Sequence, residues 1–347
     1  MGNKHTKSDL YQMQSLPLSA KIRMTEARIK GWYEEFDGNV YVARSGGKDS
    51  DVLGHIVKRM YPNVPHVFVN TGLEYDSVRL HGIEVADEVL RPSMSFVQVI
   101  TKYGYPIINK EVAQTVTEVQ KALWAGKTPA KYRMDKLDGT CINKKTGELS
   151  QYNMPQWKFL LDAPFRISHK CCDVMKKNPS KEYERSTNNK PFLGTMATES
   201  RLRKTKWLKF GCNAFEEKRP TSQPLSFWTE QDILSYIYEY GLDIADVYGD
   251  VVYTDSDGMQ YCEPVFMDDM TLTTAGVKRT GCVFCMFGIT QDEDRFLKLK
   301  EIEPQKYDYV IRGGRFDEHG LWIPHNGLGY KYVIDWLNEH GNMNIKY

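Results

Sequence analysis

The chain has 347 residues, is 41% hydrophobic and 26% charged, and carries a formal net charge of +1. This composition is typical of a folded globular protein and excludes a disordered chain. The near-neutral charge excludes an overall basic field, so a nucleic-acid partner would need a local basic patch. No apolar stretch approaches the roughly 18 residues of a membrane span, and the polar N-terminus lacks the apolar core of a secretory signal. We therefore expect a cytoplasmic protein with no membrane partner.

The first hundred residues alternate between helical and strand patterns. Residues 9–36 are predicted to be helical, and a β-rich run from Asn39 then enters a pair of glycines. Residues 50–61 have helical spacing, residues 66–70 form a second apolar strand, and residues 75–90 are predicted to be helical. This alternation predicts an α/β fold, a doubly wound and mostly parallel sheet.

The later part of the chain is less regular. Residues 125–155 are rich in Lys, Gly and Pro and are predicted to be an insertion or mobile flap. A helix is predicted after Thr229, a good N-cap, and it ends at Gly241. The region from about 245 is predicted to be irregular before a closing helix. We expect an N-terminal helical segment (1–36), a nucleotide-binding α/β domain (37–245) and a C-terminal region that carries cysteines (246–347).

The sequence Ser-Gly-Gly-Lys-Asp-Ser at positions 45–50 lies between the first strand and a helix. It fits neither the P-loop nor the dinucleotide fingerprint, because the glycines are adjacent. Glycines allow close backbone approach, a helix N-terminus favours anions, and Lys48 adds a cation. These residues predict a phosphate site, although an ordinary turn capped by Asp49 or Ser50 is the alternative. The candidate phosphate-binding residues are Ser45, Gly46, Gly47, Lys48, Asp49 and Ser50.

This loop resembles the PP-loop of ATP pyrophosphatases, which cleave ATP to AMP and pyrophosphate. The segments VFVNTGLEYDSVR, YGYPIINKE, PFLGTMATESRLRK, HKCCDVMKKNP and GCVFC resemble the phosphoadenosine phosphosulfate (PAPS) reductase family, in the expected order between about residues 39 and 288. The resemblance implies an adenine nucleotide alpha-hydrolase-like fold, ATP as ligand and Mg²⁺ on the pyrophosphate. By analogy with the fold, Thr71 and Gly72 would lie near the nucleotide.

A basic segment follows the predicted strand that ends near Met196. Arg201, Arg203 and Lys204 would suit a second oxyanion, although a solvated turn is the alternative. The resemblance covers this segment and implies that Arg201 and Arg203 bind the substrate or the α-phosphate.

The seven cysteines suggest free thiols or metal ligands in a reducing compartment. Their arrangement as an adjacent pair and a CxxC resembles the four-cysteine set of the iron–sulfur adenylyl-sulfate (APS) reductases. The resemblance implies a [4Fe-4S] cluster, with Zn²⁺ or no metal as alternatives. It is open whether Cys212 or Cys262 takes part in catalysis. The implied ligands are Cys171, Cys172, Cys282 and Cys285.

The chain also departs from the sulfonucleotide reductases. Those enzymes resemble one another in a C-terminal Glu-Cys-Gly segment and a degenerate loop, whereas this chain has no cysteine after Cys285 and an intact loop. We therefore predict an ATP pyrophosphatase that adenylates an acceptor for sulfur transfer, closest in character to DNA-phosphorothioation proteins. Lys48, Asp49 and Arg201 are its predicted catalytic residues. A PAPS or APS reductase and a non-catalytic nucleotide- or cluster-sensing subunit are the alternatives. The predicted partners are an adenine nucleotide, a nucleic-acid or small-molecule acceptor, a sulfur donor protein and, in an oligomer, further copies of the chain.

Overall fold

The computed structural model describes residues 3–264 and 270–347, and it divides the chain into two compact units. Unit 1 contains residues 1–92 and 178–280, and unit 2 contains residues 93–177 and 281–347. The three consecutive segments expected from the sequence divide the chain differently and stay a prediction. None of the helices in the described part combines the length and the apolar character that a membrane crossing requires.

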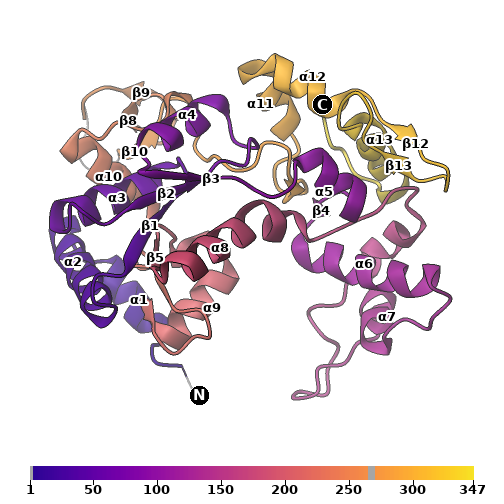
Figure 1. Cartoon of the computed structure of the whole chain (residues 1–347), viewed down its shortest axis with the longest axis horizontal. Coiled ribbons are helices and arrows are strands. Elements are labelled where there is room, and N and C mark those ends of the chain that lie inside the picture. Colours follow the sequence, from indigo (N-terminus) through magenta and orange to yellow (C-terminus); the bar gives the residue numbers. More distant parts are fainter. Residues whose placement is uncertain (1–2, 265–269) are drawn as a thin grey trace. The chain divides into compact units, whose positions relative to one another are not determined.

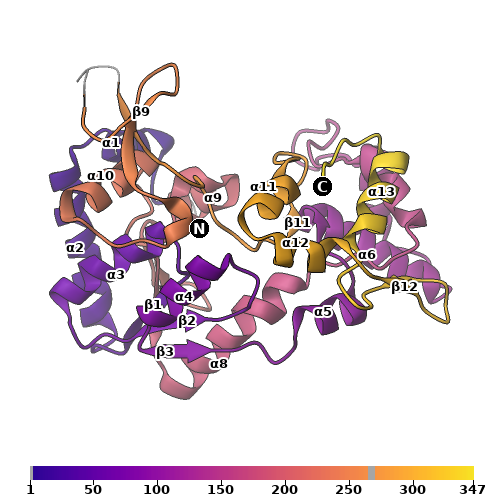
Figure 2. The ribbon, with the colours of Figure 1, turned by 90° about the horizontal axis from the view of Figure 1, so that it is seen from above.

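Unit 1 is built on a six-stranded sheet in the order β3-β2-β1-β5-β7-β6. All neighbouring strands are parallel except β6 and β7, and Figure 2 shows β1, β2 and β3 side by side. Since β1 lies between β2 and β5, the strand order reverses there, which is where open α/β sheets bind ligands. The strands are β1 (Val40–Arg44), β2 (His66–Val69), β3 (Glu88–Leu90), β5 (Lys190–Leu193), β6 (Asn213–Ala214) and β7 (Thr221–Ser222).

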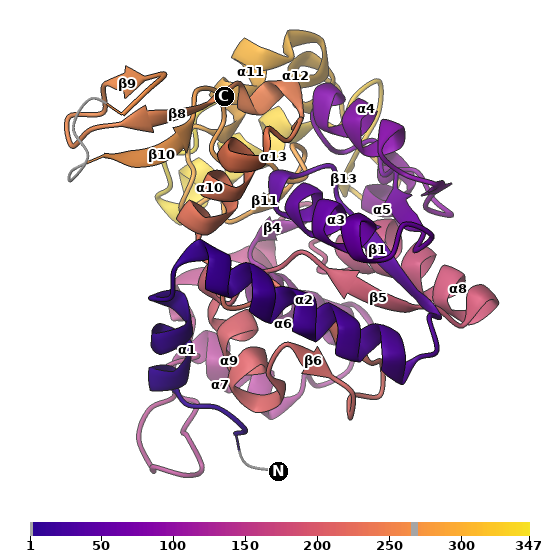
Figure 3. The same cartoon turned by 90° about the vertical axis from the view of Figure 1, so that its left-hand side faces the viewer.

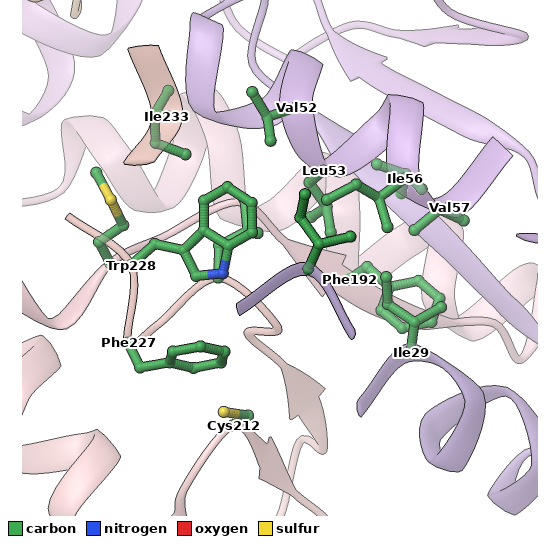
Figure 4. Close-up of a cluster of buried hydrophobic side chains, with 14 of the residues drawn as sticks. Ile29, Val52, Leu53, Ile56, Val57, Phe192, Cys212, Phe227, Trp228 and Ile233 are labelled. Atoms are coloured by element: carbon green, nitrogen blue, oxygen red, sulfur yellow. The ribbon is translucent and has the colours of Figure 1, made fainter. Parts of the chain in front are cut away.

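Helices cover both faces of this sheet. Alternate residues of β1 point in opposite directions: Val40 and Val42 join a large core with helices α2 and α3, while Tyr41 packs against Tyr183 of helix α8. Figure 3 shows α2 and α3 side by side, and Figure 4 shows their side chains meeting Phe192 and Trp228. The predicted doubly wound, mostly parallel fold is therefore confirmed. The helices of unit 1 are α1 (Lys7–Gln14), α2 (Leu18–Glu35), α3 (Lys48–Met60), α4 (Asp76–Glu84), α8 (Asn178–Thr187), α9 (Arg201–Phe210) and α10 (Glu230–Tyr240).

Several predicted elements need correction. The helix predicted over 9–36 is two helices, because the chain breaks at 15–17 before Pro17 becomes the N-cap of α2. The helix predicted over 75–90 ends at Glu84, and residues 88–90 form β3 instead. The region after 245, predicted to be irregular, contains an antiparallel sheet of β8 (Val251–Thr254), β9 (Gln260–Tyr261) and β10 (Thr271–Thr274). In contrast, α10 has the predicted Thr229 N-cap and Gly241 end.

Unit 2 combines helices with two short pairs of strands, and its hairpin β12–β13 is labelled near α13 in Figure 1. Its β4 pairs in parallel with β11, which places Met286 opposite Ile107. The predicted insertion at 125–155 contains a helix, α7. The elements of unit 2 are α5 (Phe96–Tyr103), β4 (Ile107–Ile108), α6 (Lys110–Trp124), α7 (Lys131–Asp138), β11 (Met286–Phe287), α11 (Arg295–Ile302), α12 (Pro304–Ile311), β12 (Arg315–Phe316), β13 (Trp322–Ile323) and α13 (Tyr330–Gly341).

Candidate phosphate-binding and cysteine sites

The loop at 45–50 connects β1 to the N-terminus of α3, at the strand where the sheet order reverses. Gly46 has φ +70°, and a Cβ there would lie 2.3 Å from the Val78 carbonyl oxygen, so this position requires glycine. The Ser50 hydroxyl donates to the Gly47 carbonyl at 2.7 Å and accepts the Ser45 N–H at 3.1 Å. These bonds hold the loop in one tight turn.

The same turn presents free hydrogen-bond donors. The Lys48 N–H donates to the Tyr248 hydroxyl, whereas within residues 3–264 and 270–347 no atom accepts the backbone N–H of Gly46 or Asp49. The N-cap Gly47 offers no side-chain acceptor to this end of α3. Because unsatisfied N–H groups and the helix dipole both favour negative charge, the loop has the electrostatics of an oxyanion site.

Lys48 is buried and directed to two oxygen atoms. Its Nζ lies 2.8 Å from a carboxylate oxygen of Glu230 and donates to the Lys278 carbonyl, also at 2.8 Å. The ring of Tyr248 lies 5.1 Å from the same nitrogen, within reach of a cation–π contact. Sequence reasoning missed Glu230 and Tyr248, and the only local signal was the helix start after Thr229.

The carboxyl group of Asp49 has a pKa that is raised towards neutral pH. Its Oδ1 is buried and has no hydrogen-bond partner among the described residues. Burial raises the pKa of Asp49 to about 6, although the positive charge of Lys48 opposes that increase. Such a carboxyl could donate a proton to an oxyanion, or hold a cation such as Mg²⁺ once it is ionised.

The basic segment forms helix α9, not the solvated turn that was the alternative reading of these residues. Ser200 is the N-cap of α9 and accepts the N–H of Arg203. Arg203 forms an ion pair with Glu199, and burial lowers the pKa of its guanidinium while Asp49 partly offsets that effect. Arg201 is exposed on the first turn. The structure thus places Arg203 within electrostatic range of the loop.

Thr71 and Gly72 follow β2 at the same edge of the sheet. Since Arg44 pairs with Phe68 across the two strands, the residues after β1 and β2 emerge side by side. The Thr71 hydroxyl donates to the Glu74 carboxylate at 2.8 Å and accepts the Leu73 N–H at 3.1 Å. Gly72 has φ +70°, and a Cβ there would meet no atom within 4 Å. The Thr71 hydroxyl is therefore engaged in its own turn.

The four cysteines implied as metal ligands all belong to unit 2. Burial raises the pKa of the Cys171 thiol, and the charges of the other three cysteines raise it further, so the four lie within electrostatic range of one another. Burial likewise raises the pKa of Cys285 to about 12, while the Phe287 N–H donates to its Sγ at 3.4 Å. Backbone N–H donors to sulfur are a usual feature of thiolate-held clusters. The donor set therefore fits a thiolate-bound group.

No three His, Cys, Asp or Glu residues in the described ranges are spaced to hold a single metal ion. One Zn²⁺ would require its sulfur ligands about 2.3 Å from a common point. The cysteine arrangement therefore does not distinguish Zn²⁺ from an iron–sulfur cluster.

Two of the three other cysteines differ sharply in exposure. Cys212 is buried in the core of unit 1, where it accepts a hydrogen bond from the Ser226 hydroxyl at 3.3 Å, and burial raises its pKa. A protonated thiol in a packed core is a poor nucleophile. Cys262 is exposed.

Comparison with known proteins identifies one matching family. The model for the phosphoadenosine phosphosulfate reductase domain matches residues 39–286, whereas no curated protein matches the chain. Among solved structures, a phosphoadenylyl-sulfate (PAPS) reductase from Candida auris in a phosphate complex is 13% identical, with a TM-score of 0.35, covering 71% of this chain and 92% of its own. An NAD+ synthetase from Burkholderia pseudomallei is 14% identical, with a TM-score of 0.33, covering 67% of this chain and 72% of its own.

Proposed function

The chain belongs to the phosphoadenosine phosphosulfate reductase family, and we propose that it is an ATP pyrophosphatase that adenylates an acceptor for sulfur transfer. Members of this family are enzymes that act on nucleotides. The observation that carries the proposal is the loop at the start of α3, where the N–H groups of Gly46 and Asp49 have no described acceptor and the Lys48 side chain adds a cation. Such a site suits a leaving pyrophosphate better than a single neutral ligand.

In the first step, an acceptor oxygen attacks the α-phosphorus of ATP. A bond forms between that oxygen and phosphorus, the bond from the α-phosphorus to the bridging oxygen breaks, and pyrophosphate leaves with its electrons. The loop N–H groups and Lys48 would stabilise the charge that develops on pyrophosphate. Asp49 would hold Mg²⁺ when ionised, and Mg²⁺ would neutralise part of the pyrophosphate charge. Arg203, and Arg201 if it turns inward, would bind the α-phosphate.

In the second step, hydrosulfide displaces AMP from the adenylated acceptor. The new bond joins sulfur to the acceptor, the acceptor–oxygen bond breaks, and AMP leaves as the dianion, so that no oxidant or reductant is required. A sulfur donor protein would supply the hydrosulfide. Cys171, Cys172, Cys282 and Cys285 would hold a [4Fe-4S] cluster; because four thiolates satisfy its four irons, it would supply structural or electron-transfer chemistry rather than a binding site for sulfur. The raised pKa values of Cys171 and Cys285 mean that metal binding must displace protons from these two thiols.

The family match supports a second candidate, a PAPS or APS reductase. A reductase would release sulfite from a sulfonucleotide and would not consume ATP. The intact loop favours ATP, because by resemblance the sulfonucleotide reductases have a degenerate loop. A nucleotide-sensing subunit would bind ATP without cleaving it.

The decisive experiment supplies the anaerobically purified protein with ATP and Mg²⁺, and separately with PAPS and a thiol reductant. Candidate acceptors are mixed RNA, mixed DNA and small nucleophiles. We expect acceptor-dependent release of pyrophosphate and AMP from ATP. Sulfite release from PAPS, with no pyrophosphate from ATP, would favour the reductase. ATP binding without any cleavage would favour the sensing subunit.

A further inference from the structure

We propose that Arg44, Asp51 and His81 form a positioning network that holds the phosphate-binding loop in the shape that binds an anion. These residues come from β1, α3 and α4 of unit 1. The inference rests on the proposed function of the loop, but it concerns residues to which we assign no contact with the nucleotide. They act through the backbone of the loop and the first turn of α3.

Arg44 joins the end of β1 to the first turn of α3. Its Nη1 donates to the Ser50 carbonyl at 3.0 Å, and its Nη2 donates to Asp51 Oδ1 at 2.5 Å. Both side chains of the ion pair are 4% exposed, so removing either partner would leave a buried charge. One planar guanidinium therefore fixes the same helical turn whose free N–H groups form the anion site.

Gly54 makes room for this guanidinium. It lies inside α3, where glycine is about 1 kcal/mol less favourable than alanine. A Cβ at Gly54 would lie 1.7 Å from Arg44 Nη1. A glycine in the middle of a helix is thus explained by the position of the arginine.

Helix α4 holds both the loop and the helix that follows it. The Val78 carbonyl fits against Gly46, where no Cβ could be accommodated. His81 lies three residues further on, on the same face of α4, and its Nε2 is 3.2 Å from Asp51 Oδ2. Displacing Asp51 would therefore remove the contact through which His81 holds α4 against α3.

A cavity of about 360 Å³ gives solvent access to this network. The Asp51 carboxylate, 3.2 Å from His81 Nε2, raises the pKa of His81, while burial and Arg44 oppose the increase and Glu84 supports it. When the pH rises through this pKa, His81 loses its charge and its ion pair with Asp51 weakens. The charged and titratable groups around the cavity are Arg44, Asp51, His55, Lys58, His66, His81, Glu84, Asp87 and Asp243.

The test compares Arg44→Lys with the matched control Arg219→Lys. Lysine keeps the charge but cannot bridge Ser50 and Asp51 with one planar fork. Arg219 makes a two-contact pair with the Glu184 carboxylate, at 2.7 and 2.5 Å, in the same unit, and its side chain is more exposed than that of Arg44. Two measurements are made on the full chain: the affinity for inorganic pyrophosphate by calorimetry, and hydrogen exchange of the amides of residues 46–51 without ligand.

We expect Arg44→Lys to weaken pyrophosphate binding by about ten- to a hundredfold, since a ~1 Å misplacement of binding groups can cost about a hundredfold. Exchange of the Ser50 and Asp51 amides, which both donate to the Gly47 carbonyl, should accelerate, and Arg219→Lys should change neither quantity. Gly54→Ala should reproduce the effect of Arg44→Lys. The double variant Arg44→Met, Asp51→Leu removes both buried charges, so it should be more stable to heat than a variant that removes only one of them. Its affinity for pyrophosphate should stay low, because no guanidinium then bridges the Ser50 carbonyl and residue 51.

A His81→Asn variant separates positioning from a merely structural role. Between pH 6 and 9, wild-type affinity should fall more steeply than that of the variant, and the ionisation of pyrophosphate and of Asp49 cancels in this comparison. Unchanged affinity and exchange in Arg44→Lys, or equal losses in Arg219→Lys, would overturn the inference. A wild-type protein that binds pyrophosphate but never cleaves ATP contradicts the proposed function alone, whereas one that does not bind pyrophosphate contradicts both.

Discussion

Replacing Lys48 by methionine tests the phosphate site most directly, because it removes one charge and keeps the side-chain length. The lost contacts are the two 2.8 Å bonds from Nζ to Glu230 and to the Lys278 carbonyl. A hydrogen bond to a charged group contributes about 1.5–3 kcal/mol. However, Glu230 is 37% exposed, so water replaces part of what it loses. We therefore expect the free energy of unfolding to fall by only about 1–2 kcal/mol.

The expected effect on catalysis is larger than the effect on folding. A cation about 4 Å from one phosphate charge contributes ~4 kcal/mol at an effective dielectric constant of about 20. Because ~1.4 kcal/mol corresponds to a factor of ten, pyrophosphate release should fall by about 10³-fold. The contrast between the two magnitudes is the signature of a residue that stabilises developing charge.

The assay converts released pyrophosphate to phosphate with a coupling enzyme, at a temperature where urea titration shows both proteins to be folded. The matched control is Lys278→Met, since Lys278 contacts Lys48 through its backbone carbonyl, which the substitution keeps. The control should retain wild-type turnover. A Lys48→Met variant within about fivefold of wild type would refute the assignment of Lys48 to the pyrophosphate.

Three further predictions concern the loop and the cysteines. Gly46→Ala should lower the free energy of unfolding by more than Gly72→Ala does in urea titrations: both have φ +70°, which costs ~1–2 kcal/mol with a Cβ, but only Gly46 faces a carbonyl at 2.3 Å. The folded chain binds the Asp49 proton more tightly than the unfolded chain, because burial raises its pKa to about 6. The contribution of Asp49 to the free energy of unfolding therefore falls as the pH rises from about 4 to about 6. The Asp49→Asn variant should lack up to ~3 kcal/mol of that decrease. Equal pH profiles of stability for the two proteins would contradict this. Cys285→Ser should lose iron and acid-labile sulfide after anaerobic purification, whereas Cys262→Ser, at an exposed position in unit 1, should keep wild-type content; a colourless wild-type protein that contains zinc would exclude the cluster.

The sequence predicted the regular part of the fold because its signals are local. The β1–loop–α3 unit is a short apolar run, two glycines and a 3.6-residue period, and all three are visible within 20 residues. The Thr229 cap of α10 is another local signal, and it was predicted at the correct residue. The failures arose where local preference and tertiary packing differ. Residues 88–90 continue a helical pattern but extend the sheet beside β2, because three residues suffice for pairing at a sheet edge.

The candidate site was predictable only in its contiguous part. Residues 45–50 could be identified from their order, but Glu230 is 182 positions from Lys48 and no spacing rule connects them. The order of the basic residues suggested that Arg201 and Arg203 act together. Their helical conformation instead leaves Arg201 exposed and half-buries Arg203 beside Glu199. Helical periodicity would have separated these two side chains, had the segment been identified as a helix.

The pairing of Lys48 with Glu230 has a consequence for how an anion binds. A pyrophosphate that reaches the loop must take the place of a carboxylate that already neutralises the lysine. The replacement is inexpensive, because Glu230 is more than one third exposed and regains water as it leaves. In return, Lys48 is already extended and oriented before the nucleotide arrives, so less side-chain entropy is lost on binding. Glu230→Gln should therefore strengthen pyrophosphate binding by removing the competing charge, and calorimetry should show weaker binding only if Glu230 serves mainly to orient the lysine.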